Sequence, residues 1–319
     1  MTRGLKLAAG LALLLVPFAI IDWAATLAAL AGAAPLPLVV ALLTLSANIP
    51  LSAVKWTLLL HVQGIRPGFL AALQAYWIGS FFSNYLPSNV SGDVVRLVVL
   101  RAEGKRAEVA SSILVERLIG LVVLVALAVL ALTLRPAYFD RFGLLELLWL
   151  LVLGLAGAMA LVLVAGEPLG RWLQRRAGGR NGFACRLMAI VARVALALAV
   201  YRRRPMVLLG ALALSLPFYG ILILFQYLIL GALGASLPLA EVALIAPLVQ
   251  LVGLLPLAPN GLGLVEGAFV LFFVQAGVAP EIALAAALLR RILSFAVSLV
   301  GGLIWLQRAP AARPARAEG

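Results

Sequence analysis

The chain has 319 residues, of which 65% are hydrophobic and 12% charged, and its formal net charge is +13. Long apolar runs recur throughout, which excludes a soluble globular protein and indicates a polytopic helical membrane protein. The single cysteine, Cys185, excludes an intrachain disulfide and a cysteine metal cluster, and the single histidine, His61, argues against a histidine-rich metal site and a Ser-His-Asp triad. No nucleotide-binding motif occurs either, so we expect no cofactor.

The first two apolar segments predict spans one and two. Two basic residues precede the apolar run 7–21, which we interpret as an uncleaved first span with a cytosolic N-terminus; a cleaved signal peptide is the alternative. Residues 22–37 contain no basic residue and are expected to form an outer loop. Span two, 38–60, returns to the cytosolic side, toward which Lys55 is expected to snorkel.

Residues 69–102 predict a hairpin rather than a single crossing. The first half of this segment is apolar and aromatic, but the residues after it are strongly basic, and basic residues favour the cytosolic side. The hairpin would therefore enter from the cytosol, turn at residues 87–92 within the polar island 84–96 and go back. A bilayer tolerates such helix-breaking backbone only where protein or a water-filled cavity shields it.

Two spans and a basic segment follow. Span three is expected at 110–134 and span four at 144–165. The segment 167–204 is the most basic of the chain, and its apolar part, 187–200, is shorter than the roughly 20 residues that a span needs. We therefore predict a cytosolic amphipathic helix on the membrane surface.

The second half of the chain resembles the first. Span five, 205–231, is followed by a second apolar hairpin, 239–275, broken at residues 256–263. Because the loop after this hairpin contains no basic residue, the hairpin is expected to enter from outside. Span six, 282–306, then returns to the cytosol, and the Ala/Pro/Arg tail 307–319 is expected to be disordered.

This topology places most of the basic residues and both termini at the cytosolic face of the cytoplasmic (inner) membrane. The net charge is then a consequence of topology, and no nucleic-acid partner is expected. The segments 38–134 and 205–306 each contain a span, a hairpin and a span, but enter from opposite sides. We therefore expect a single membrane domain, 1–319, with an all-α polytopic fold. It would have about six transmembrane helices plus two re-entrant or broken hairpins arranged as an inverted repeat, or eight helices if the hairpins span.

Two adjacent arginines in span six, Arg290 and Arg291, are the first candidates for substrate binding. A charge at a helix centre costs roughly 2.5 to 3.5 kcal/mol, so it usually faces a cavity or a partner. A guanidinium matches phosphate bidentately, and we expect one of the two to bind an anionic headgroup. A structural pair with Glu266 or Glu281 is the alternative. Glu266 is also a candidate site residue, and because the second hairpin has no basic residue of its own, we favour a pair of Glu266 with Arg290 or Arg291 across the cavity.

A second set of charges surrounds the first hairpin. Asp93 and Arg96 are three residues apart and can pair on one helix, and Glu116 and Arg117 open span three nearby. This set is either an ion-pair network that holds the hairpin in place or a site of substrate contact or proton coupling.

The turns of both hairpins are candidates because of their backbone. Proline ends one half-helix, glycine permits a tight turn, and the next half-helix presents unpaired N–H groups that suit a phosphate. Asparagines are expected to cap these ends, and a purely structural turn is the alternative. The residues concerned are Pro87, Pro259, Gly92, Gly261, Gly263, Asn84, Asn89 and Asn260.

Several of these motifs resemble the membrane region of lysylphosphatidylglycerol synthases, a flippase-like family with stand-alone bacterial and archaeal members. The resemblance lies in residues 48–56, 86–96, 116–117 and 259–266 and in Arg290. In bifunctional members a soluble domain that makes the aminoacyl lipid follows this region, and the chain as given ends at Gly319 without one. The resemblance therefore implies movement of a lipid between leaflets and no synthase activity.

The function expected is that of a flippase or transporter for an anionic phospholipid or polyprenyl-linked lipid, with membrane lipids as partners and homo-oligomerisation left open. The alternatives are a membrane enzyme or accessory subunit of an aminoacyl-lipid, glycolipid or hopanoid pathway, and a small-solute transporter.

Overall fold

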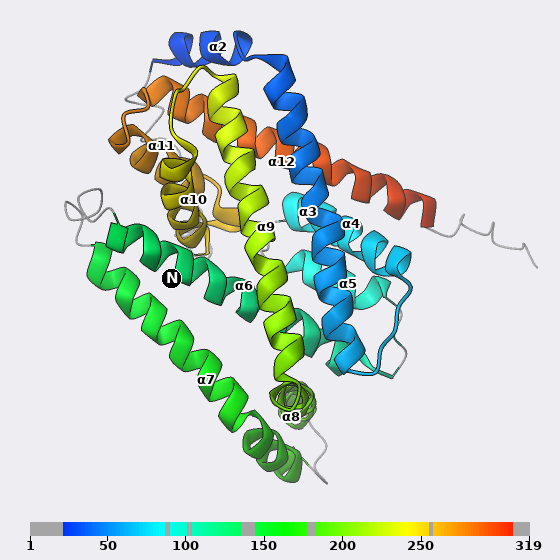
Figure 1. The fold of residues 1–319 in the computed structure, drawn as a ribbon. Coiled ribbons are helices and arrows are strands. Elements are labelled where there is room, and N and C mark those ends of the chain that lie inside the picture. The colour runs from blue at the N-terminus through cyan, green and yellow to red at the C-terminus, as the bar shows by residue number, and fades with distance from the viewer. Residues whose placement is uncertain are drawn as a thin grey trace, which may run out of the picture.

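The computed structural model describes residues 22–86, 90–100, 102, 104–134, 144–177, 183–254 and 258–308. Over these residues the chain forms eleven α-helices and one 3-10 turn, with no strand (Figure 1). The predicted all-α fold class is confirmed.

Four helices are long and apolar enough to cross a membrane. They are α3 (Pro35–Val62), α6 (Arg106–Leu134), α9 (Pro205–Ala232) and α12 (Pro280–Arg308). Each has 28 or 29 residues, and at 1.5 Å per residue each spans about 42 Å, more than the roughly 30 Å of a hydrocarbon core. They coincide with predicted spans two, three, five and six, while predicted span one lies outside the described residues.

The helix α7 (Leu144–Ala177) covers predicted span four. It has 34 residues and therefore continues into the predicted basic segment, where Arg171 pairs with Glu167 one turn earlier at 2.6 Å. In Figure 1 it extends along the margin of the molecule.

The first predicted hairpin is formed by α4 (Phe69–Tyr85) and α5 (Ser91–Val99). The nine residues of α5 span only about 14 Å, too little to cross the hydrocarbon core alone. The two helices lie side by side and touch at Gly92. The contact is so close that a Cβ at this position would lie 2.3 Å from the carbonyl oxygen of Gly79. Gly92 thus permits helix contact within α5, which corrects the expectation that it forms the tight turn.

The second predicted hairpin is formed by α10 (Leu239–Gly253), the 3-10 turn η3 (Pro259–Gly261) and α11 (Leu264–Gln275). The 12 residues of α11 span about 18 Å. Asn260, Gly261 and Gly263 have φ values of 50°, 63° and 75°, so the expected tight turn at the two glycines is confirmed. Asparagine and glycine are the residues that best tolerate this left-handed backbone.

The order of helix lengths recurs along the chain. The helices α3, α4, α5 and α6 have 28, 17, 9 and 29 residues, and α9, α10, α11 and α12 have 28, 15, 12 and 29. A long helix, two short helices and a second long helix therefore occur twice.

The largest hydrophobic core joins these two sets of helices. Phe269 and Phe273 of α11 are fully buried with ring centroids 4.3 Å apart, and they share a cluster with Ile229 of α9 and Ile245 of α10. Leu124 and Ala128 of α6 and Ala285 to Ala287 of α12 belong to the same cluster. The second hairpin is thus packed inside the protein, which is where a bilayer permits interrupted helices.

Two predicted segments differ in detail. Within the expected loop 22–37, residues Trp23–Ala31 form the helix α2, whose first N–H groups are capped by Asp22. In the predicted surface segment, α8 (Phe183–Arg202) packs one face on the protein: Ala192, Leu198 and Tyr201 are buried, and Tyr201 donates a hydrogen bond to the carbonyl of Leu59. Placement of α8 at the cytosolic membrane surface stays a prediction.

Candidate functional site

A cavity of about 800 Å³ lies between the first hairpin and the long helices. Its lining comes from α3, α4, α5, α6, α9 and α12, with Leu251 and Leu254 from the end of the first limb of the second hairpin. One group of lining residues is aliphatic, including Leu45, Ile49, Leu121 and Val297. The other group is charged or polar, so the cavity has an amphiphilic wall.

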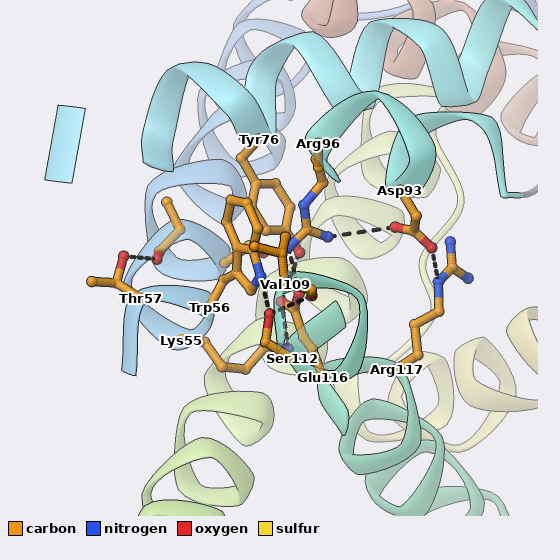
Figure 2. A network of polar contacts seen from close by, with 12 residues as sticks. Lys55, Trp56, Thr57, Tyr76, Asp93, Arg96, Val109, Ser112, Glu116 and Arg117 are labelled. Carbon is orange, nitrogen blue, oxygen red and sulfur yellow. Dashed lines mark hydrogen bonds and ion pairs between the residues drawn. The ribbon is translucent and has the colours of Figure 1, made fainter. Parts of the chain in front are cut away.

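Glu116 of α6 lies at the centre of the charged wall (Figure 2). Its Oε2 accepts a hydrogen bond from Arg96 at 2.7 Å, and its Oε1 accepts one from the Tyr76 hydroxyl at 2.8 Å. The Lys55 ammonium lies 3.7 Å from the same Oε1. Glu116 is only 4% exposed, so these contacts replace the water that an ionised carboxylate would otherwise require.

Arg96 of α5 is held by aromatic rings as well as by carboxylates. Its guanidinium carbon lies 4.1 Å from the centroid of the Trp56 ring and 4.0 Å from that of Tyr76, as the sticks in Figure 2 show. A planar guanidinium suits such a sandwich because it stacks on aromatic faces while its edge donates hydrogen bonds. Trp56 is itself fixed by donating to Ser112 Oγ at 3.0 Å.

Asp93 connects this arrangement to Arg117. One of its oxygens lies 3.5 Å from Arg96, and the other accepts a hydrogen bond from Arg117. The predicted pairing of Asp93 with Arg96 is confirmed, and Glu116 and Arg117 belong to the same network. Hairpin one is therefore tied to α6 by ion pairs whose members, apart from the half-exposed Arg117, are largely removed from solvent.

Lys55 belongs to the site although the sequence analysis assigned it to the membrane interface. Its side chain is 5% exposed and lies beside Glu116, with Ser215 Oγ at 3.4 Å and the Phe218 ring centroid at 4.8 Å. The expected snorkelling is therefore wrong. The available signal was a lysine seven residues before the end of an apolar helix, about 10 Å from that end.

Asn48 and Ser52 extend the polar wall along α3. Together with Lys55 they follow the i, i+4, i+7 spacing of one helix face, and all three line the cavity. In the sequence, Asn48 and Ser52 were noted only as part of the motif 48–56, and Tyr76 was assigned no role.

The charges of the second hairpin form a separate cluster. Arg291 of α12 contacts Glu266 of α11 at 2.6 Å, and Arg290 lies 3.8 Å from it, so the predicted pairing of Glu266 with these arginines is confirmed. Arg291 also donates to the carbonyl oxygens of Asn260 and Gly261 at 3.3 and 3.4 Å. Arg291 thereby stabilises the turn of the hairpin.

None of these charged residues is among the described residues that line the 800 Å³ cavity. The structure therefore separates the predicted site into a cavity network around Glu116 and a turn network around Glu266. Headgroup contact by Arg290, whose Nε has no hydrogen-bond partner, stays a prediction.

The two hairpin turns meet through asparagines. Asn260 Nδ2 donates to the carbonyl oxygen of Leu86 at 2.7 Å and lies 3.4 Å from that of Asn84. Asn84 Nδ2 in turn donates to the carbonyl of Ser294 on α12 at 3.1 Å, and both Asn84 and Ser294 line the cavity.

These contacts correct the expectation that the two asparagines cap helices. The helix α5 begins after Val90, and α11 begins after Gly263, whose N–H is bonded by Glu266 at 2.8 Å. Asn84 and Asn260 instead bind backbone carbonyls across the hairpins. The predicted Pro87 and Asn89 lie outside the described residues, and Pro259 begins η3.

The charges of both networks are unbalanced. Among the described residues, the cavity is lined by three basic side chains, those of Lys55, Arg96 and Arg117, and by two acidic ones, those of Asp93 and Glu116. The turn network has two arginines and one glutamate. Across the described residues, no group of three or more His, Cys, Asp or Glu side chains is placed to hold a metal ion.

Comparison with known proteins agrees with this architecture. Residues 4–302 match the family described as the lysylphosphatidylglycerol synthase TM region. A UPF0104 membrane protein of Methanothermobacter thermautotrophicus is 26% identical over 271 residues, which cover 78% of this chain and 77% of that protein. Another match to a UPF0104 membrane protein of that organism is 36% identical over 89 residues, which cover 28% of this chain and 26% of that protein.

UPF0104 membrane protein PH1989 of Pyrococcus horikoshii is 20% identical over 298 residues, covering 85% of this chain and 86% of that protein. No solved structure matches the chain. Since the family match extends over nearly all of the sequence, the chain belongs to the lysylphosphatidylglycerol synthase transmembrane-region family of multi-pass membrane proteins.

Proposed function

We propose that the protein moves an anionic lipid between the leaflets of the cytoplasmic membrane. The headgroup would occupy the cavity around Glu116, and the acyl or prenyl tail would stay in the bilayer. The observation that carries this proposal is a cavity with a charged wall and an aliphatic wall, built between helices long enough to cross a membrane.

The size and charge of the cavity suit such a cargo. Its volume of about 800 Å³ lies within the roughly 300–1,000 Å³ of typical small-molecule sites. The excess of one basic residue in its lining favours an anion, and the aliphatic residues suit the start of a lipid tail. A phospholipid and a polyprenyl-linked phosphate share these two features.

The recurrence of helix lengths supports a transport cycle. We propose that the segments 38–134 and 205–306 are an inverted repeat, with the first hairpin entering from the cytosol and the second from outside. In transporters built this way, interrupted helices meet near the midplane and one repeat moves against the other. The contact of Asn260 with Leu86 is where the two hairpin turns touch.

Transport without chemical change of the lipid is proposed because the cavity carboxylates are already engaged. Glu116 is bonded by Arg96 and Tyr76, and Asp93 by Arg96 and Arg117. An enzyme would need an acid or base free to exchange a proton with a substrate. Carboxylates held by basic partners serve better as counter-charges that pair again when the cargo leaves.

A leaflet-exchange assay tests the proposal. Purified protein is placed in liposomes that contain fluorescent anionic or zwitterionic lipids, and the fraction accessible to an external quencher is followed with time. Leu121→Trp would place a larger side chain on the aliphatic wall and fill part of the cavity. Leu209→Trp, on the exposed face of α9, is the matched control. We expect exchange by the wild type and by the control, and a strong loss in Leu121→Trp.

Exchange equal to that of protein-free liposomes, for anionic phospholipids and isoprenoid phosphates with or without a proton gradient, would refute the flippase proposal. Equal rates for Leu121→Trp and the control would place transport outside this cavity.

A further inference from the structure

We infer that Lys55 is the cation that contacts the anionic group of the cargo and sets the selectivity of the cavity for anions. This inference rests on the proposed function of the cavity and goes beyond it by separating one binding residue from the basic residues that hold the structure. The shared chemistry of the ligand is a phosphate or other anionic oxygen group.

Arg96 is committed to the protein. Its side chain is 6% exposed and lies between two aromatic rings while donating to Glu116 at 2.7 Å. Moving this guanidinium toward a cargo would break a buried ion pair and both ring contacts. Arg96 therefore positions Glu116 and α5 and does not follow the cargo.

Arg117 is a weaker candidate because of its surroundings. Its side chain is 48% exposed and already bonded to Asp93. A charge that remains partly solvated gains little by exchanging one partner for another, since its interactions are screened.

Lys55 is as buried as Arg96 but is held much less closely. Its ammonium lies 3.7 Å from Glu116 and 3.4 Å from Ser215, while both oxygens of Glu116 receive shorter bonds from other residues. Among the described residues, the one carboxylate that pairs with Lys55 is that of Glu116, which is shared with Arg96 and Tyr76. A buried ammonium with such partners is poorly compensated, so an anion entering the cavity would gain a strong charge-assisted contact there.

A second observation on the same helix face points to a polar ligand. Asn48, two turns before Lys55, is 4% exposed and lines the cavity, yet within the described part of the chain its Oδ1 has no hydrogen-bond partner. Buried polar groups are nearly always bonded. An unbonded amide oxygen on the same helix face as a poorly compensated ammonium marks this part of α3 as a surface that a polar headgroup completes.

Three variants separate binding from a merely structural contribution. Lys55→Gln removes the excess charge of the cavity, leaving two basic and two acidic residues, whereas Lys55→Arg keeps it. Lys105→Gln is the matched control, because Lys105 is exposed, lies outside the cavity lining and donates to the carbonyl oxygen of Gly64.

Each variant is assayed for thermal stabilisation by phosphatidylglycerol, phosphatidylcholine and inorganic phosphate, and for leaflet exchange of the two lipids. For Lys55→Gln we expect a loss of at least about tenfold in the preference for phosphatidylglycerol, with a smaller effect on phosphatidylcholine, whose choline cation already compensates its phosphate. Lys55→Arg should retain most of the preference, and Lys105→Gln all of it. Stabilisation by inorganic phosphate that disappears in Lys55→Gln would support the same contact for a free anion.

An unchanged preference in Lys55→Gln, or an equal loss in Lys105→Gln, would overturn the inference. If Lys55→Gln does not fold, Lys55→Arg decides alone, because it keeps the positive charge. A folded Lys55→Arg that has lost the preference for phosphatidylglycerol would also overturn the inference. Absence of exchange by the wild type would refute the flippase proposal alone, because the binding measurements would still decide whether Lys55 contacts the anion.

Discussion

Replacing Glu116 by glutamine is expected to destabilise the protein strongly. The carboxylate and its partner Arg96 have side chains that are 5% and 6% exposed, so the variant leaves a buried guanidinium whose remaining carboxylate partner is Asp93 at 3.5 Å. Removing one partner of a buried ion pair costs about 3–5 kcal/mol. A loss of that size lowers the folding equilibrium constant by a factor of roughly 10² to 10⁴.

Unfolding in detergent micelles, followed by tryptophan fluorescence during titration with a denaturing detergent, measures this loss. Glu167→Gln is the matched control, because Glu167 makes an exposed pair with Arg171 on α7 and such pairs contribute about 0–1 kcal/mol. A change for Glu116→Gln of less than about 1 kcal/mol, or one equal to the control, would contradict the view that Glu116 ties the first hairpin to α6.

Three further substitutions test other features. Gly92→Ala places a Cβ 2.3 Å from a carbonyl oxygen of α4 and should lower the free energy of unfolding by about 1–3 kcal/mol, measured by thermal unfolding. Gly220→Ala, whose Cβ would meet nothing within 4 Å, is the control and should be neutral or stabilising. A similar effect of both variants would refute the close contact at Gly92. Asn260→Gly keeps the left-handed backbone but loses the bond to Leu86, so hydrogen exchange at residues 258–263 should rise by a factor that corresponds to about 1 kcal/mol; unchanged exchange would show that the turns are not tied there. Asn48→Leu removes a buried amide whose Oδ1 has no partner among the described residues, and it should stabilise the protein by about 1 kcal/mol while slowing lipid exchange. Destabilisation would indicate that the amide is already satisfied.

Local patterns of the sequence predicted the hairpins well. Apolar segments interrupted by proline, asparagine and glycine are short-range features, and the helices α4, α5, α10 and α11 lie where those patterns place them. The pairing of Asp93 with Arg96 was predictable for the same reason, since residues three apart are neighbours on a helix. The pairing of Glu266 with the arginines of span six was predicted because the second hairpin contains no basic residue of its own.

The helix packing decided which charges share a cavity. Lys55 and Glu116 are 61 positions apart, and only the contact of α3 with α6 brings them to 3.7 Å. Arg290 and Arg291 looked equally suited to a cargo, but the packing of α12 on α11 directs them to Glu266. Asn84 and Asn260 were expected to cap helices because their type favours caps, whereas the helix packing brought them within hydrogen-bond distance of backbone carbonyls on other elements.

The sequence by itself determined the membrane class, the long spans and the position of both breaks, because hydrophobic length and backbone preference act over a few neighbouring residues. Only the tertiary structure decided that Lys55 is buried beside Glu116, that Arg96 lies between Trp56 and Tyr76, and that the turn of the second hairpin is bonded to that of the first. The physical reason is that burial of a charge in an apolar protein depends on partners from other helices, and the choice of partner follows from which helix faces meet.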